Sequence, residues 1–203
     1  MLKKNQVEIL NLFRKNIFLK CSILEIKKKT KKSSYQRVYE SVKELEKEKI
    51  LNVEKIGNTS LVSLALNNNS IPKLSFLDEE SLENKKLPNY EKIISLKELS
   101  RYLVIATGSY VKREEKKNSD LDIVAVISDN EDVLEVQKLL DNLFYLFHPK
   151  IHLYVFKNKD FIEMLVSKEE NYGKEIFRNN LILKNAHIYY EILKESIENG
   201  FKG

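Results

Sequence analysis

Two aspartates separated by one residue, Asp120 and Asp122, are the side chains whose type and spacing point most directly to chemistry. The apolar run from Leu121 to Ile127 predicts a strand, and side chains two apart on a strand face the same way. Two carboxylates on one face repel each other unless a cation lies between them. Because carboxylate oxygens are hard ligands, we expect the pair to hold Mg²⁺, or Mn²⁺, completed by water and substrate phosphates.

A second chemical feature precedes the aspartates in the sequence. The apolar run from Tyr102 to Ala106 predicts another strand, and Gly108 and Ser109 follow it after a single threonine. A glycine at this place lets the backbone approach a ligand closely, because it has no Cβ. The Ser109 hydroxyl and the backbone N–H groups of the turn suit a phosphate, especially where a helix begins. Residues 108–122 therefore predict a phosphate site next to a cation site.

Written as a pattern, this stretch is Gly-Ser, ten residues, Asp, one residue, Asp. It resembles the signature of the DNA polymerase beta nucleotidyltransferase superfamily, and most closely its minimal nucleotidyltransferases, in which a serine like Ser119 precedes the first aspartate. The resemblance covers about residues 95–195. It implies that Gly108 and Ser109 bind the phosphates of a nucleoside triphosphate. It also implies that Asp120 and Asp122 are catalytic and hold Mg²⁺, while an acceptor hydroxyl attacks the α-phosphate in line and pyrophosphate leaves.

The sequence departs from that family pattern in the phosphate turn. Minimal members often carry Ala-Arg-Gly where this chain has Val111, Lys112 and Arg113. With Arg113 in place of a glycine, we expect a less sharply turned loop. We also expect Lys112 and Arg113 to reach the phosphates and count them, with Gly108 and Ser109, as nucleotide-binding residues.

A second departure concerns the third metal-binding carboxylate, which the family carries on the next core strand. The strand predicted at 151–156 contains no acid, and His152 occupies the corresponding position. Neutral histidine is a poor ligand for Mg²⁺. The next acid, Asp160, is expected to cap a helix, while Glu114 and Glu115 are the other acids to locate.

Strands and helices alternate around these residues, which favours a mixed α+β domain with a small mixed sheet flanked by helices. Helices are expected from Val133 to Phe144, from Asp160 to Val166 and from Ala186 to Ile197, whereas Ile176 to Leu183 is ambiguous between helix and strand. Tyr172, Lys174 and Arg178 are either late nucleotide contacts or part of a solvated helical face. We place this domain at 95–203, after a linker at 71–94.

The first 70 residues have a different charge. They hold 15 Lys and Arg against 7 Asp and Glu, a net charge of +8, although the whole chain has a net charge of only +5. Apolar spacing predicts a helix around Val7 to Phe13, a short one from Cys21 to Ile26, and a third from Ser34 to Lys49. Two strands follow, joined at Gly57-Asn58. Three helices and a hairpin resemble a winged helix-turn-helix domain, which implies DNA binding.

In that fold the third helix enters the major groove and the wing contacts the DNA backbone. The residues expected to contact nucleic acid are basic or polar and lie at the start of the third helix or just before it: Lys31, Lys32, Ser34, Tyr35, Gln36 and Arg37. Ser33 belongs to the same segment. The alternative is a basic, solvated surface on a domain that binds protein or dimerises.

Two hypotheses follow for the whole chain. In the first, it is an Mg²⁺-dependent enzyme that moves AMP from ATP to a protein or other hydroxyl acceptor and is coupled to a DNA-binding module. In the second, it is a DNA-binding transcriptional regulator whose impaired transferase domain only binds nucleotide. A homodimer would suit palindromic DNA. The single cysteine, Cys21, fits a buried thiol in a reducing cytoplasm, and no apolar run is long enough for a membrane span.

Overall fold

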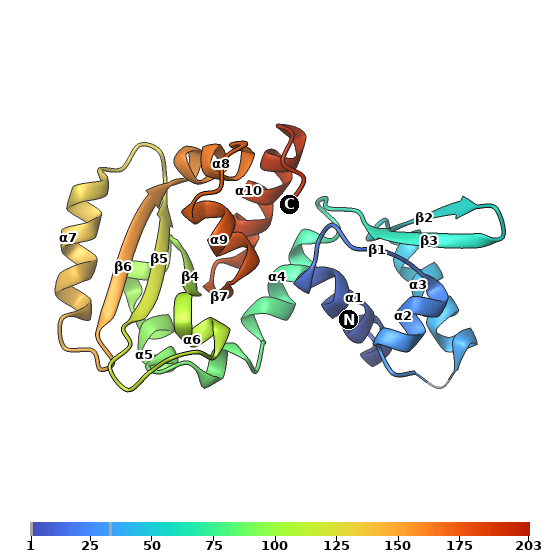
Figure 1. Ribbon diagram of the computed structural model, residues 1–203, viewed down its shortest axis with the longest axis horizontal. Helices are drawn as coiled ribbons and strands as arrows, with labels where there is room; N and C mark the ends of the chain where they lie inside the picture. The colour runs from blue at the N-terminus through green and yellow to red at the C-terminus, as the bar shows by residue number, and fades with distance from the viewer. Residues whose placement is uncertain (1, 33) are drawn as a thin grey trace. The chain divides into compact units, whose positions relative to one another are not determined.

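The computed structural model in Figure 1 describes residues 2–32 and 34–203. The chain divides into two compact units, Met1–Leu77 and Asp78–Gly203, which are described separately below. Both units combine helices with a small sheet, so the mixed α+β class predicted from the sequence is confirmed.

The first unit packs three helices against a small antiparallel sheet. Its elements are α1 (Lys4–Lys15), β1 (Lys20–Ser22), α2 (Ile23–Lys29), α3 (Tyr35–Lys47), β2 (Leu51–Ile56) and β3 (Thr59–Leu64). The strands lie in the order β1-β3-β2. Apolar positions on α1 and α3, among them Leu10, Phe13 and Val42, are fully buried in the core. The β2–β3 turn uses Gly57 at φ +58°, a conformation that glycine adopts without a steric cost.

The second unit is built on a four-stranded sheet in the order β6-β5-β4-β7. β5 (Leu121–Ile127) is antiparallel to β4 (Leu103–Thr107) and parallel to β6 (Ile151–Lys157), while β7 (Leu181–Lys184) is antiparallel to β4. Its helices are α5 (Tyr90–Ser95), α6 (Gly108–Lys112), α7 (Val133–Phe144), α8 (Asn158–Val166), α9 (Tyr172–Arg178) and α10 (Ala186–Glu198). Two 3-10 turns, Asn84–Lys86 and Lys97–Leu99, flank α5, and α4 (Ile71–Glu79) begins before the unit boundary and ends after it.

The two faces of this sheet have different roles. Leu121, Ile123 and Leu153 point to one face and share a core with α5 and α7. Because side chains alternate along a strand, Asp122 and His152 point to the opposite face. Figure 1 shows α7 on one side of the sheet and α8, α9 and α10 on the other. The candidate site residues Asp122 and His152 therefore lie on the face that α8, α9 and α10 cover only in part.

Three expectations from the sequence need correction. Cys21 lies in strand β1, paired with Val62 of β3, and not in a helix. Asp160 is not the cap of α8, because Lys157 holds the N-cap position and Asp160 lies in the first turn, where its charge favours the helix dipole. The ambiguous stretch at 176–183 contains both the end of α9 and the start of β7. The burial of Cys21 is confirmed.

Candidate functional site

Strand pairing brings the Gly-Ser turn against the second aspartate. Thr107, the last residue of β4, lies opposite Asp122 in β5, so Gly108 emerges directly beside the Asp122 side chain. Gly108 has φ +74°, and a Cβ on it would lie 1.9 Å from Oδ2 of Asp122. The position therefore requires glycine both for its backbone conformation and for the space that the carboxylate fills.

The phosphate turn continues into α6, a helix of one turn that ends at Arg113. Arg113 adopts the left-handed conformation, with φ +60° and ψ +40°, and its N–H bonds to the carbonyl of Ser109. The expectation of a less sharply turned loop is therefore wrong, because arginine takes up the conformation that a glycine would adopt there. For a non-glycine residue this costs roughly 1–2 kcal/mol.

The polar loop between α6 and β5 is tied down at Ser119. The Ser119 hydroxyl accepts a hydrogen bond from the backbone N–H of Lys116 at 2.8 Å. The Tyr110 hydroxyl on α6 donates to the Ser119 carbonyl at 3.3 Å. These bonds fix the chain immediately before Asp120, which lies exposed at the entrance to β5. They give Ser119 a structural role that the family pattern alone did not explain.

Asp122 faces a histidine on the neighbouring strand. His152 pairs with Asp122 in the parallel register of β5 and β6, and its Nδ1 lies 3.3 Å from Oδ1 of Asp122. The hydroxyl of Tyr154 lies 3.1 Å from the same nitrogen. Burial raises the pKa of the Asp122 carboxyl, the nearby His152 opposes that rise, and the negative charges of Asp120 and Glu175 add to it.

Glu175 on α9 is the acid that reasoning from the sequence missed. Its Oε1 accepts a hydrogen bond from Nζ of Lys112 at 2.8 Å, which joins α9 to the end of α6. This hydrogen bond raises the pKa of Lys112, and the charge of Glu175 is close enough to raise that of Asp122. The sequence of β6 contains no acid and gives no sign of this contact, which depends on how α9 packs over the sheet.

Other residues of α9 also have defined surroundings. Tyr172 packs against Tyr154, with ring centroids 4.7 Å apart, and burial raises the pKa of its hydroxyl well above the ordinary value. Nη2 of Arg178 donates to both carboxylate oxygens of Glu170, each at 2.7 Å. Tyr172 thus belongs to the site, whereas the guanidinium of Arg178 is paired with Glu170, which precedes α9 in the chain.

Comparison with known proteins gives this region a family. Residues 88–183 match the family model described as "Nucleotidyltransferase domain". This part of the chain is therefore similar to nucleotidyltransferase domains. A solved structure described as "Crystal structure of the toxin-antitoxin with AMP-PNP" is similar over 54% of this chain and 85% of that chain, with 18% sequence identity and a TM-score of 0.37. No curated protein matches the sequence.

The carboxylates of Asp120 and Asp122 fit one partly solvated divalent cation. Within residues 2–32 and 34–203, no three His, Cys, Asp or Glu side chains cluster closely enough to enclose a metal ion. Mg²⁺ does not need such a cage, since it usually binds through one or two carboxylates together with water and substrate phosphates. Asp120 raises the pKa of Asp122, so the two charges repel each other across a short distance. A cation between them would relieve that repulsion.

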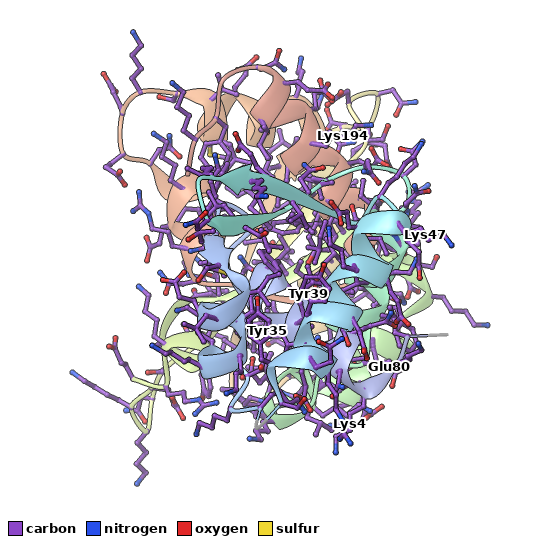
Figure 2. The ribbon with its side chains drawn as sticks, turned by 90° about the vertical axis from the view of Figure 1, so that its right-hand side faces the viewer. Lys4, Tyr35, Tyr39, Lys47, Glu80 and Lys194 are labelled. Carbon is purple, nitrogen blue, oxygen red and sulfur yellow. The ribbon has the colours of Figure 1, made fainter. Side chains whose placement is uncertain are left out.

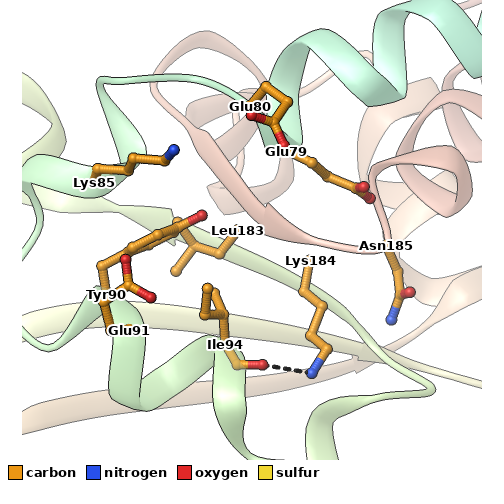
Figure 3. Close-up of a pocket in the computed structure, with 9 residues that line it drawn as sticks. All are labelled: Glu79, Glu80, Lys85, Tyr90, Glu91, Ile94, Leu183, Lys184 and Asn185. Atoms are coloured by element: carbon orange, nitrogen blue, oxygen red, sulfur yellow. Dashed lines mark hydrogen bonds between the residues drawn. The ribbon is translucent and has the colours of Figure 1, made fainter.

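A hollow of about 450 Å³ lies elsewhere in the second unit, at the β7 edge of the sheet. Figure 3 shows Tyr90 and Ile94 of α5 facing Leu183 and Lys184 of β7 across it. The Lys184 ammonium is already occupied, because it donates to the carbonyls of Ile94 and Leu96. None of the residues predicted to bind nucleotide or metal lines this hollow.

In the first unit, the residues expected to contact nucleic acid have varied surroundings. Lys31 is exposed and has a positive φ of 52°. Lys32 pairs with Glu8 of α1. The Ser34 hydroxyl caps α3 by accepting a hydrogen bond from the backbone N–H of Arg37 at 3.3 Å. Ser33 lies outside the described residues.

The start of α3 presents an aromatic and polar face. Tyr35 and Tyr39 are 46% and 37% exposed, and their rings stack with centroids 6.4 Å apart. Figure 2 looks onto this face of the helix and labels both rings. Gln36 donates to Glu40 at 2.8 Å, while Arg37 is exposed. In the described part of the chain, no helix has both the length and the apolar character needed to cross a membrane.

Proposed function

We propose that the nucleotidyltransferase domain moves AMP from ATP to a hydroxyl group on a protein or other acceptor, with Mg²⁺ or Mn²⁺ as its cofactor. One observation carries this proposal: the Asp122 carboxylate occupies the space that a side chain on Gly108 would fill. The turn suited to phosphates and the carboxylates suited to a cation are thus in direct contact. Nucleoside triphosphates carry both of these partners together.

Each residue of the turn has a task in this scheme. Backbone N–H groups at Gly108 and the Ser109 hydroxyl bind phosphate oxygens, and the cations of Lys112 and Arg113 balance their charge. Lys112 is held by Glu175 at 2.8 Å, so it exchanges one anionic partner for another when the triphosphate arrives. The exchange costs little, because an ion pair at the solvent-exposed surface contributes little to stability.

Asp120 and Asp122 would hold the metal ion, which when bound neutralises phosphate charge and aligns the groups that react. The acceptor oxygen forms a bond to the α-phosphorus, and the bond from that phosphorus to the bridging oxygen breaks. Pyrophosphate leaves with the electron pair, and the hydroxyl proton is released. His152, at 3.3 Å from Asp122, orients the carboxylate from the side on which related enzymes place a third acid.

The test uses two preparations of ATP, one labelled at the α-phosphate and one at the γ-phosphate. Each is incubated with the full-length protein, Mg²⁺ or Mn²⁺, and cell extract as the source of acceptors. Label at the α-phosphate should enter a macromolecule, whereas label at the γ-phosphate should not. The Asp120→Ala/Asp122→Ala variant should transfer none. Asp141→Asn, which changes an exposed acid on α7, is the matched control. Equal labelling by wild type and double variant, or transfer of the γ-label, would contradict the proposal.

We propose further that the first unit is a winged helix-turn-helix that binds DNA. Three helices, a sheet that ends in a hairpin, and the basic residues before α3 support this assignment. Such binding should weaken steeply as salt rises, because it releases counterions from the phosphates. Footprinting at two salt concentrations tests it, and absence of protection even at low salt would remove it.

The second candidate function, a regulator whose transferase domain only binds nucleotide, is favoured by one observation. A histidine stands beside Asp122 where a third carboxylate would complete a two-metal site. In that case ATP changes DNA affinity without any transfer of label. Measuring both quantities on one preparation separates the two candidates, and sedimentation of the same sample tests whether the protein is a homodimer.

A further inference from the structure

Four aromatic side chains form a continuous row on the site face of the nucleotidyltransferase domain. His152, Tyr154 and Phe156 alternate along β6 and therefore share one face, and Tyr172 reaches them from α9. The ring centroids of His152 and Tyr154 are 4.4 Å apart, and those of Tyr154 and Phe156 are 6.5 Å apart with the ring planes inclined by 10°. Tyr172 lies 4.7 Å from Tyr154. We call these four residues the aromatic row.

The row starts at the candidate cation site and leads away from it. His152 is its first ring, 3.3 Å from the Asp122 carboxylate, and its side chain is 55% exposed. Tyr154 and Phe156 follow at two-residue steps along β6, each of about 6.6 Å between Cα atoms. The strand register places Tyr154 beside Val124, whose buried apolar side chain points to the same face of the sheet. A ligand with charge at one end and an aromatic ring at the other matches this arrangement.

We propose that the aromatic row is the subsite for the nucleobase of the triphosphate held at Gly108 and Asp122. This inference rests on the proposed function, since it extends the same bound nucleotide by one group. Every base has a π-face, so stacking tolerates all four bases and favours the larger purines over pyrimidines by a few-fold. The row thus supplies the affinity for the base, while the Gly-Ser turn and the carboxylates supply that for the phosphates.

A purely structural role for the row is the competing explanation. Tyr172 is half-buried between α9 and the strand, and its contact with Tyr154 helps to hold α9 over the sheet. This explains Tyr172, whereas the His152 ring contacts Tyr154 and Asp122 and still leaves more than half of its side chain exposed next to the carboxylates. Tyr154 is the ring to change, since it contacts both neighbours and is not itself beside Asp122.

The experiment compares the binding of ATP with that of inorganic tripolyphosphate, which has the phosphates but no base. Titration calorimetry in the presence of Mg²⁺ measures both ligands on the full-length protein. Tyr154→Leu should weaken ATP binding about tenfold and leave tripolyphosphate binding unchanged. Tyr154→Phe, which keeps the ring, should bind ATP within a factor of two of wild type. Tyr145→Leu, at a tyrosine that is 84% exposed after α7, is the matched control.

A second measurement guards against a folding defect in Tyr154→Leu. The chain contains no tryptophan, so Tyr154→Trp introduces the sole indole fluorophore. ATP should quench its emission by stacking, whereas tripolyphosphate should not. Unchanged ATP affinity in Tyr154→Leu, or an equal loss of affinity for both ligands, would overturn the inference while leaving the proposed function intact. If wild type binds neither ligand, the proposed function fails and the inference fails with it.

Discussion

The Gly108–Asp122 segment and the basic segment at 27–37 carry their functional groups in opposite ways. In the first, each group is fixed by a backbone constraint: Asp122 fills the space beside Gly108, and Ser119 pins the loop before Asp120. In the second, the lysines of α2 and of the turn after it lie at the surface, and Lys32 of that turn pairs with Glu8 of α1. A fixed site selects a ligand by shape, whereas an exposed row of charges selects it by charge alone.

Charge within the first unit sharpens that contrast. Helix α3 has three basic residues, Arg37, Lys43 and Lys47, and three glutamates, so its net charge is zero. Half of the +8 net charge of residues 1–70 lies in α2 and the turn after it, where five lysines face one glutamate: Lys27, Lys28, Lys29, Lys31 and Lys32 against Glu25. If this unit binds DNA, the phosphates are contacted mainly by α2 and its turn, while α3 presents tyrosines and amides to the bases.

The largest expected effect comes from breaking the fixed site at its centre. Gly108→Ala places a Cβ where the Asp122 carboxylate lies, so the carboxylate must move. We expect nucleotidyl transfer to fall by about 10²–10³-fold, as when a group that stabilises charge is displaced. Gly57→Ala is the matched control, because Gly57 has a similar positive φ of 58° but no atom near its missing Cβ. It should cost stability alone, and equal activity losses in the two variants would contradict the steric argument.

Two variants with smaller and opposite effects on ATP affinity test the contact between α6 and α9. Lys112→Met should weaken ATP binding about tenfold, because a charged hydrogen bond to phosphate is lost. Glu175→Gln should strengthen it by a few-fold, because it releases Lys112 for the triphosphate. Titration calorimetry measures both. Glu170→Gln, which breaks the ion pair between Arg178 and Glu170 of the loop before α9, should leave the ATP affinity unchanged. Weaker ATP binding by Glu175→Gln would mean that Glu175 itself contributes to binding.

The surface charges of the first unit should show smaller and graded effects. Lys31→Ala and Arg37→Ala should each reduce the slope of log affinity for DNA against log salt by about one, as expected for one lost phosphate contact. Lys43→Ala is the control, since Lys43 is bound to Glu46 at 2.7 Å further along α3. Filter binding at several salt concentrations gives the slopes, and equal slopes for all three variants would place the DNA contact elsewhere.

Much of this arrangement was predictable from local pattern. The strand Leu121–Ile127 and the helix Val133–Phe144 have the predicted bounds, and Ser34 caps α3 as a serine before a helix should. These features depend on periodicity and capping, which neighbouring residues determine. The family resemblance led us to expect His152 where a third carboxylate would stand, and the parallel register of β5 and β6 sets it beside Asp122.

The features that could not be predicted from the sequence depend on residues far apart in the chain. The strand β1 has three residues and exists because Lys20–Ser22 pairs with β3, about 40 residues later. Glu175 reaches Lys112 across 63 residues, and no spacing rule connects them. Arg113 adopts a left-handed turn that residue preference opposes, since the loop around it is fixed by other bonds. Distant partners thus override local preference in both units, in β1 of the first and around the candidate site of the second.

The smallest effect concerns the stability cost of the fixed carboxylate. Burial raises the pKa of Asp122 above its unfolded value, so its charge disfavours the folded state. That cost is fully present at neutral pH, shrinks as pH falls through the folded pKa, and is gone below the unfolded pKa of about 3.9. Asp122→Asn should therefore raise the unfolding midpoint by roughly 2 °C at pH 7, with no gain near pH 3.5. Asp141→Asn should leave the midpoint unchanged, and a lower midpoint for Asp122→Asn at pH 7 would mean that the His152 contact outweighs burial.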